Sequence, residues 1–170
     1  MDKMVVTILL MVAGVVGSLI VINTAMPIIH KSGSDLVNVA DNLDNRIQSD
    51  VQIIQVIGEL DSGGNFSDTD SDGRFDIFVW VKNVGKVRID DIPNCEVFYG
   101  QTGDFQRITY SPSQAVFPCW RYSLEGGATE WGISNTCKFE LSFSSAEAAG
   151  TYWVKVILPN GIEDEKDFAM

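Results

Sequence analysis

The stretch that decides the fold is an uncharged apolar run, MVVTILLMVAGVVGSLIVINTAMPII, at residues 4–29. A helix rises about 1.5 Å per residue, so this run is longer than the ~30 Å hydrocarbon core of a bilayer. A secretory signal peptide has a shorter apolar stretch followed by a small-residue cleavage site. We therefore predict a helix that anchors the chain in a membrane or packs among other apolar helices. A buried helix of a soluble core is the alternative.

The apolar pattern becomes periodic after Pro27. Leu36, Leu43 and Ile47 recur at helical spacing, with aspartates between them. Such a stripe is typical of an amphipathic helix that packs against a neighbour. Because proline is tolerated in long apolar helices, we predict one continuous helix from about residue 3 to about residue 49.

The pattern from residue 75 onward has a period of two. Alternation is clearest at residues 75–82 and 152–158, and turn signals such as Pro159-Asn160-Gly161 separate the segments. Many short strands with regular turns are typical of an antiparallel sandwich. The sequence therefore predicts an α+β chain with a helical domain at residues 1–49 and an antiparallel Ig-like β-sandwich at residues 50–170. Other candidate strands are 50–59, 86–89, 95–99, 105–110, 137–143 and 163–168.

The chain is strongly acidic. Its formal net charge is -11, and because Asp2 and Lys3 cancel, the whole excess lies in residues 31–170. Such a surface repels phosphate backbones, so we expect no nucleic-acid partner.

Signals for catalysis are weak. His30 is the single histidine, and no serine-hydrolase, zinc-protease or phosphate-loop motif occurs. We therefore expect no enzymatic activity. A carbohydrate-binding face is one use for tryptophans, but sandwich core and subunit contacts are commoner uses. The tryptophans are Trp80, Trp120, Trp131 and Trp153.

An acidic motif, DTDSDGRFD at residues 68–76, precedes one predicted strand. Its D-x-D-x-D-G spacing brings alternate carboxylates onto one hard cation, and Gly73 permits the sharp turn. The sequence predicts a calcium site here, although the last glutamate of an EF-hand is missing. A solvated acidic turn is the alternative. The predicted ligands are the side chains of Asp68, Asp70, Asp72 and Asp76 and the carbonyl group of Arg74.

Two covalent modifications are suggested. Asn65-Phe66-Ser67 is a glycosylation sequon, a motif that also occurs often by chance. None of the three cysteines has the C-x-x-C spacing of a metal or redox site. One hypothesis is a disulfide between Cys119 and Cys137 that closes the glycine-rich segment between them, with Cys95 free. Three buried thiols is the other.

Four segments resemble archaellins, the archaeal flagellins, and the accessory archaellum proteins built on the same plan. They are the apolar helix, its continuation LVNVADNLDNRIQSDVQIIQVIGE, the strand segment FVWVKNVGKVRI and the C-terminal GTYWVKVILPNGIEDEKDF. The resemblance implies a type IV pilin-like helix and a helical homopolymer for motility. It also implies insertion in the membrane before assembly, an extracellular position at the cell surface, and archaellum motor and platform proteins as partners.

Two features bear on this resemblance. Bacterial-type pilins carry glutamate at the fifth mature position, where this chain has Val5, which favours the archaellin side. Archaellins are made with a short basic leader, and none precedes Met1. Either the numbering starts at the processed end, or the helix is an uncleaved anchor.

A bundle of apolar helices requires close approach between them. Small residues near the middle of the run provide it, although ordinary transmembrane composition also contains them. The alternative functions are a membrane-anchored archaellum accessory protein and a calcium-dependent surface adhesin or pilin. The predicted assembly residues are Ala13, Gly14, Gly17, Leu36, Leu43 and Ile47.

Overall fold

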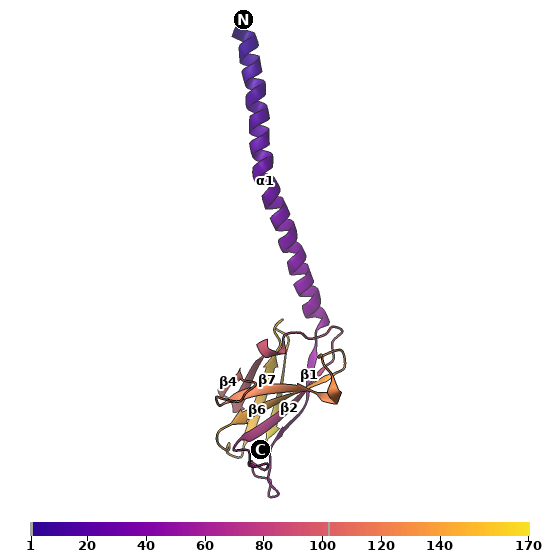
Figure 1. The fold of residues 1–170 in the computed structure, drawn as a ribbon, viewed down its shortest axis with the longest axis vertical. Coiled ribbons are helices and arrows are strands. Elements are labelled where there is room, and N and C mark those ends of the chain that lie inside the picture. Colours follow the sequence, from indigo (N-terminus) through magenta and orange to yellow (C-terminus); the bar gives the residue numbers. More distant parts are fainter. Residues whose placement is uncertain (1, 102) are drawn as a thin grey trace. The chain divides into compact units, whose positions relative to one another are not determined.

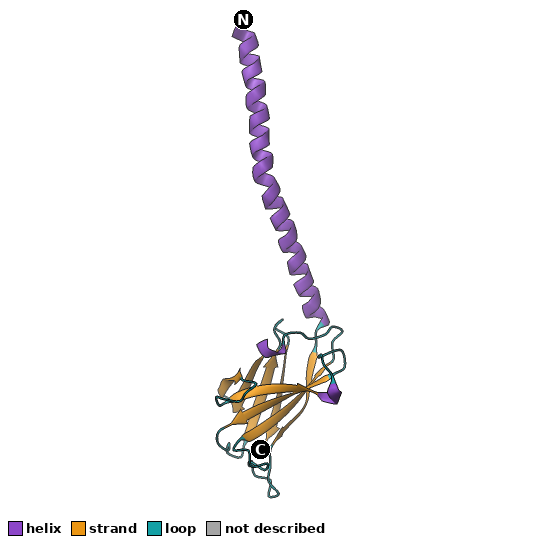
Figure 2. Ribbon diagram, viewed as in Figure 1, coloured by secondary structure: helices purple, strands orange, loops and turns teal. Residues whose placement is uncertain are grey.

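The structure is a computed structural model that describes residues 2–101 and 103–170. The chain divides into two compact units, Met1–Leu43 and Asp44–Met170. The first unit is helical, and the second contains the end of the same helix and all eight strands (Figure 1; Figure 2).

Helix α1 (Asp2–Gln48) is continuous and contains Pro27, as predicted. Its Lys3–Pro27 part has a mean hydropathy of 2.9 and is long and apolar enough to cross a membrane. The hydroxyls of Thr7 and Thr24 donate to helix carbonyls four residues earlier, both at 2.8 Å. These polar groups are therefore satisfied inside the helix and do not oppose an apolar environment. The side chain of His30 lies outside the described part of the chain.

Eight strands form a continuous hydrogen-bonded order, β1-β2-β6-β5-β4-β3-β7-β8. All neighbouring pairs are antiparallel except β4 and β5, which pair in parallel over Thr109↔Cys119 and Tyr110↔Trp120. The strands are β1 (Val51–Gly58), β2 (Phe75–Asn83), β3 (Glu96–Gln101), β4 (Asp104–Tyr110), β5 (Cys119–Leu124), β6 (Thr136–Phe143), β7 (Thr151–Ile157) and β8 (Glu163–Ala169).

The two halves of this order face each other as a sandwich. An immunoglobulin sandwich has strands A, B, E and D in one sheet and C, F and G in the other. Here β1, β2, β6 and β5 form one half, and β4, β3, β7 and β8 form the other. The predicted fold class, a long apolar helix followed by an Ig-like sandwich, is confirmed.

The core lies between the halves. Val79 and Phe139 of one half and Val154 of the other are fully buried. The rings of Tyr99 and Phe143 meet across the core with their centroids 4.9 Å apart. The sandwich therefore has its own core, which α1 does not supply.

The first and last strands, β1 and β8, are joined by side chains. The carboxylate of Asp164 accepts the Ile53 N–H at 2.6 Å, and the Lys166 ammonium donates to the Ile54 carbonyl at 2.8 Å. The register of β1 shifts between Ile53 and Gln55, which leaves Ile54 as an extra residue. Charged side chains and bulges at an edge hinder pairing with another chain.

Backbone hydrogen bonds fix the chain where the helix passes into β1. The Gly85 N–H donates to the Asp50 carbonyl at 3.0 Å, and the Lys86 N–H donates to the Gln48 carbonyl at 2.8 Å. A Cβ atom at Gly85 would lie 2.5 Å from the Asp50 nitrogen and 2.7 Å from the Gln48 oxygen. Glycine is therefore required for this close approach of two backbones.

Side chains extend this junction. The Asn83 side chain is fully buried, and its amide oxygen accepts the Gly85 N–H at 3.0 Å. On the other side, Asn160 donates to the Ser49 hydroxyl at 2.7 Å. That hydroxyl donates in turn to the Asn45 carbonyl, also at 2.7 Å. The turn at Asn83–Gly85 and the predicted turn at Pro159-Asn160-Gly161 thus hold the end of the helix.

One strand prediction was wrong, and one strand was missed. Residues 86–89 form no strand; Ile89 makes an isolated bridge to Trp131, and the Lys86 N–H binds the helix end instead. Strand β5 was missed because its first two residues, Cys119 and Trp120, are both buried and its sequence CWRYSL lacks clear alternation.

Substituting Gly85 with alanine tests the junction. The added methyl group must displace backbone atoms, so we expect the free energy of unfolding to fall by about 2 kcal/mol or more. Gly132→Ala is the control, since a Cβ there would lie 3.5 Å from its nearest neighbour, which is ordinary contact. Thermal melts of the full chain followed by circular dichroism compare the variants. Equal melting temperatures would contradict the close approach.

Candidate functional site

The predicted assembly residues of α1 lie on its surface. Leu36, Leu43 and Ile47 are 70%, 53% and 81% exposed. Nothing in the described chain outside the helix lies within 4 Å of a Cβ built at Gly14 or Gly17. A contiguous exposed apolar surface of this size marks contact with a membrane or with another protein. The assembly role of these residues, and of the exposed Ala13, stays a prediction.

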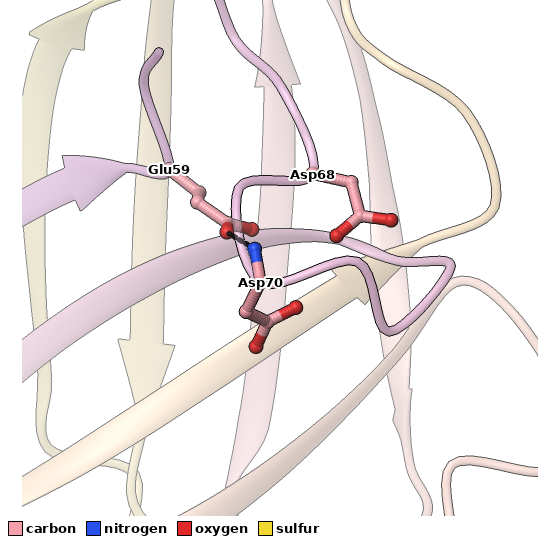
Figure 3. Close-up of side chains that lie close together, drawn as sticks. All are labelled: Glu59, Asp68 and Asp70. Carbon is pink, nitrogen blue, oxygen red and sulfur yellow. Dashed lines mark hydrogen bonds between the residues drawn. The ribbon is translucent and has the colours of Figure 1, made fainter. Parts of the chain in front are cut away.

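The acidic loop between β1 and β2 forms the second candidate site. Carboxylate oxygens of Glu59, Asp68 and Asp70 lie within 4.8 Å of one another (Figure 3). Three carboxylates at this spacing suit a hard cation, which binds oxygen ligands. Calcium binding stays a prediction, since an exposed acidic turn has similar geometry.

Backbone donors hold these carboxylates in place. The Asp68 carboxylate accepts the Asp72 N–H at 3.1 Å and the Gly73 N–H at 2.8 Å. The Glu59 carboxylate accepts the Thr69 N–H at 2.7 Å. Oε1 of Glu59 also accepts from the Thr69 hydroxyl and the Asp70 N–H, so Oε2 is the oxygen of Glu59 left for a cation. Each oxygen of Asp68 accepts one of these N–H groups and retains a second lone pair.

Crowding of charge affects Asp70. The Asp72 N–H lowers the pKa of Asp70, but removal of water and the charges of Asp72 and Glu59 outweigh it, so the pKa lies above its usual value. A bound cation would relieve this repulsion.

The structure brings some of the predicted ligands together and places others elsewhere. Asp68 and Asp70 lie in the cluster, whereas the side chain of Asp72 pairs with the Arg74 guanidinium at 2.6 Å. Glu59 was not predicted, because it lies nine residues before the motif. The antiparallel bridge between Leu60 and Phe66 brings it back beside the loop. One sequence signal could have identified Glu59: it is an acidic residue directly after a strand that leads into a hairpin.

Asp76 lies apart from the cluster, on the outer face of β2 opposite Ser142. It is 5% exposed, and its Oδ1 has no hydrogen-bond partner among the described residues. Burial, aided by the charge of nearby Glu140, raises the pKa of Asp76 to about 6, against the opposing hydrogen bond from Ser142. Glu140 is itself paired with Arg121 and accepts from Gln114 at 3.2 Å. Asp76 is thus a buried acid within a polar cluster.

The predicted disulfide is wrong. Cys119 lies opposite Ser142 in the β5–β6 pair, whereas Cys137 lies opposite Leu124. The two cysteines are therefore about five residues, or ~17 Å, apart along the strands, and a disulfide needs Cα atoms within about 7 Å. All three cysteines are buried free thiols, the other hypothesis. Burial raises the pKa of the Cys95 thiol to about 12.

The sequon asparagine, Asn65, is exposed in the same β1–β2 loop. Its amide nitrogen, which would carry a glycan, lies 3.2 Å from Oδ2 of Asp61. Glycosylation stays a prediction.

Comparison of the structure with solved structures finds archaellum proteins. The archaellum periplasmic stator protein FlaG from Sulfolobus acidocaldarius is similar over 71% of this chain and 99% of that chain, with 20% identity and a TM-score of 0.53. The chain therefore shares the fold of this archaellum protein. A chain of the periplasmic stator complex of FlaF and FlaG from the same organism is similar over 69% of this chain and 87% of that chain, with 18% identity and a TM-score of 0.54.

The chain is also similar in fold to an archaeal flagellin. FlaB1 from Methanocaldococcus jannaschii is similar over 72% of this chain and 90% of that chain, with 14% identity and a TM-score of 0.51. Comparisons with family models and with curated proteins give no match. The resemblance predicted from the sequence is therefore confirmed at the level of the fold.

Calcium should stabilise the sandwich if it binds the folded loop. At a hundredfold excess over the dissociation constant the gain is about 2.7 kcal/mol. Magnesium should replace calcium poorly, because flexible oxygen ligands suit the larger ion. We expect Glu59→Gln and Asp68→Asn each to remove the calcium dependence of the melting temperature, and Asp104→Asn, outside the loop, to leave it intact. Identical melting temperatures in calcium and in chelator would contradict the calcium site and favour the alternative, a solvated acidic turn.

Asp76 should make stability fall as pH rises. Its folded pKa of about 6 exceeds the ordinary value of 3.8, so the folded chain binds the proton more tightly. That contribution is complete below pH ~4 and is lost as pH rises through ~6. In chelator, we expect Asp76→Asn to be about 2 kcal/mol more stable than the original chain at pH ~8 and equally stable at pH ~4. Denaturant unfolding at both pH values measures this difference. A constant difference would contradict the raised pKa.

Proposed function

We propose that this chain is a structural subunit of an archaellum-type motility filament. It polymerises through α1, and its sandwich lies outside the filament core. The observation that carries the proposal is the apolar stripe of Leu36, Leu43 and Ile47, which continues beyond the part of α1 that is suited to a membrane.

The length of the apolar surface favours a bundle over a lone anchor. The membrane-suited part, Lys3–Pro27, has 25 residues and is ~37 Å long as a helix, which is enough for a bilayer. A single anchor would leave the stripe beyond it in water. Burial of each such side chain contributes about 1.5–3 kcal/mol, and a filament repeats this gain in every subunit.

The small residues support the same proposal. Gly14 and Gly17, together with Ala13, form a patch where a second helix backbone can approach closely. Such patches are typical of helix–helix contacts in apolar surroundings, where packing replaces the hydrophobic effect.

The proposal includes a location and partners. Before assembly, α1 anchors each subunit in the membrane. The subunits then bind archaellum motor and platform proteins, which assemble them. In the filament the sandwich is extracellular at the cell surface. The calcium site would stiffen the outer β1–β2 loop.

A membrane-anchored stator-like protein is the second candidate. It is favoured by the similarity to FlaG, which extends over 99% of that chain. The two candidates differ in stoichiometry. A filament subunit forms long helical polymers with α1 at the axis, whereas a stator-like protein remains a small membrane complex. Electron microscopy of the native cell-surface material and of the purified full chain distinguishes them.

Leu43→Asp should abolish polymerisation. The charge cannot be buried in a helix bundle without a partner, so subunit addition becomes unfavourable by several kcal/mol. Filament length in electron micrographs measures the effect, and circular dichroism checks that the sandwich remains folded. Asn38→Asp is the matched control, because residue 38 lies at a similar position along the helix but on the face opposite Leu43. Filaments of normal length from the Leu43 variant would contradict the packing surface.

A further inference from the structure

Aromatic side chains gather on the outer face of the β4-β3-β7-β8 half of the sandwich. Strand pairing places both Phe105 and Trp153 opposite Gly100. Because glycine has no side chain, the two rings meet above it, with their centroids 5.2 Å apart. The ring of Phe98, two residues before Gly100 on the same side of β3, lies 6.3 Å from that of Phe105. Phe105 is 53% exposed, so these rings form an aromatic surface open to solvent.

Charged side chains surround these rings, and the acids outnumber the bases. Both bases form ion pairs with acids of the same surface, at distances between 2.8 and 3.4 Å. Four acids against two bases leave an excess of negative charge. We call this surface, with its rings, the acidic face. Its charged residues are Glu96, Arg107, Lys155, Glu163, Glu165 and Asp167.

The other half of the sandwich has aromatic and basic side chains on its outer face. Trp80 pairs with Lys138 across β2 and β6, and Phe78 pairs with Ile57 of β1 on the same side of the sheet. The Lys138 ammonium lies 5.1 Å from the centroid of the Phe78 ring, a distance typical of a cation–π contact. Ile57 is 40% exposed, so this surface is also partly apolar and open to solvent.

The exposed charges of this second surface are mostly positive. Its acids Asp76 and Glu140 are buried, at 5% and 7% exposure, and cannot meet a partner. Exposed Glu125 accepts the Trp80 N–H at 3.0 Å. Three bases therefore stand against one exposed acid. We call this surface, with its rings, the cationic face, and its bases are Lys82, Arg121 and Lys138.

The two faces are complementary. Each has aromatic rings at its centre, and their exposed charges have opposite signs. The tryptophans are distributed accordingly: Trp120 and Trp131 are 1% exposed in the core, whereas Trp80 and Trp153 lie one on each outer face. Aromatic residues are enriched at protein interfaces. Copies of a chain with a net charge of -11 repel one another, so a contact between them is favoured where bases meet acids.

The two faces lie on opposite sides of one sandwich, which determines the kind of contact they can make. A contact between two different surfaces is heterologous, and its repetition forms an open chain of copies. We infer that in the filament the acidic face of each sandwich packs against the cationic face of the next. This inference rests on the proposed function and deepens it, because it names the surfaces that join neighbouring sandwiches outside the α1 core.

The size of the faces makes the contact dependent on α1. Four strands at ~4.8 Å spacing give a width of ~19 Å, and three rows of side chains give a similar length, so each face covers on the order of 400 Å². A stable interface buries about 800 Å² on each partner. The faces alone are therefore too small for a stable dimer. Assembly through α1 raises the local concentration of sandwiches and so promotes the contact.

The test uses a zero-length carbodiimide cross-linker, which joins a lysine amine to a carboxylate in direct contact. Lys138 and Asp167 point outward from different sheets of one sandwich, so a link between them must join two copies. The full chain is assembled from equal amounts of ¹⁵N-labelled and unlabelled protein, and electron microscopy records the assembly state. We expect mass spectrometry to find mixed-isotope links from Lys82 or Lys138 to acids of the acidic face.

Two variants test the same contact without cross-linking. Phe105→Ala on the acidic face and Lys138→Glu on the cationic face should each raise the concentration needed for polymerisation about tenfold. Ile133→Ala is the control for the first, because Ile133 is 59% exposed in the β5–β6 loop. Lys86→Glu is the control for the second, because Lys86 is exposed after the end of β2. Circular dichroism checks that each variant is folded.

The outcomes separate this inference from the proposed function. Filaments without links between the two faces would overturn the inference and leave the proposed function intact. Small membrane complexes that contain these links would support the contact and overturn the filament. Small complexes without them would overturn both. Mixed-isotope links that join two acidic faces, or a polymerisation threshold unchanged in both face variants, would also overturn the inference.

Discussion

An apolar helix surface that its own chain leaves uncovered is the constraint on which the rest of the molecule depends. Because none of the most apolar part of α1 is buried within the chain, the sandwich must stabilise itself. It does so with a core of Val, Ile and aromatic side chains drawn from both sheets. The apolar surface of the helix is therefore available for contacts with other molecules. The two units thus differ in where their apolar side chains lie: inside the sandwich, and on the surface of the helix.

The sequence was most informative where one physical effect dominates. Hydropathy and period identified α1 and the alternating strands β2 and β7, since burial alone determines those patterns. Strand β5 escaped because Cys119 and Trp120 are both buried and break the alternation. Residues 86–89 looked like a strand, yet the backbone of Lys86 binds the helix end. A local sequence pattern does not predict which distant residue a backbone N–H or carbonyl group binds.

The candidate cation site illustrates a similar limit. The motif spacing correctly brought Asp68 and Asp70 together, because alternate residues of a tight loop converge. It could not supply Glu59, which the chain returns to the loop through a β-bridge, or foresee that Asp76 is buried in β2. The cysteines were misjudged for the same reason, since strand register decides which thiols meet. The meeting of Phe105 and Trp153 left no linear signal, because strand pairing brings both opposite Gly100.

The seam between β1 and β8 has a consequence for crowded assemblies. In a polymer, many identical sandwiches are held at very high local concentration, the condition under which open strand edges fuse into continuous sheets. Here Asp164 and Lys166 occupy backbone groups of Ile53 and Ile54 from within the same molecule. In the proposed filament, neighbouring sandwiches would then meet at this seam through side chains, and side-chain contacts can slide and re-form. In the proposed filament, such a coat would bend as the filament turns without its subunits fusing into one sheet.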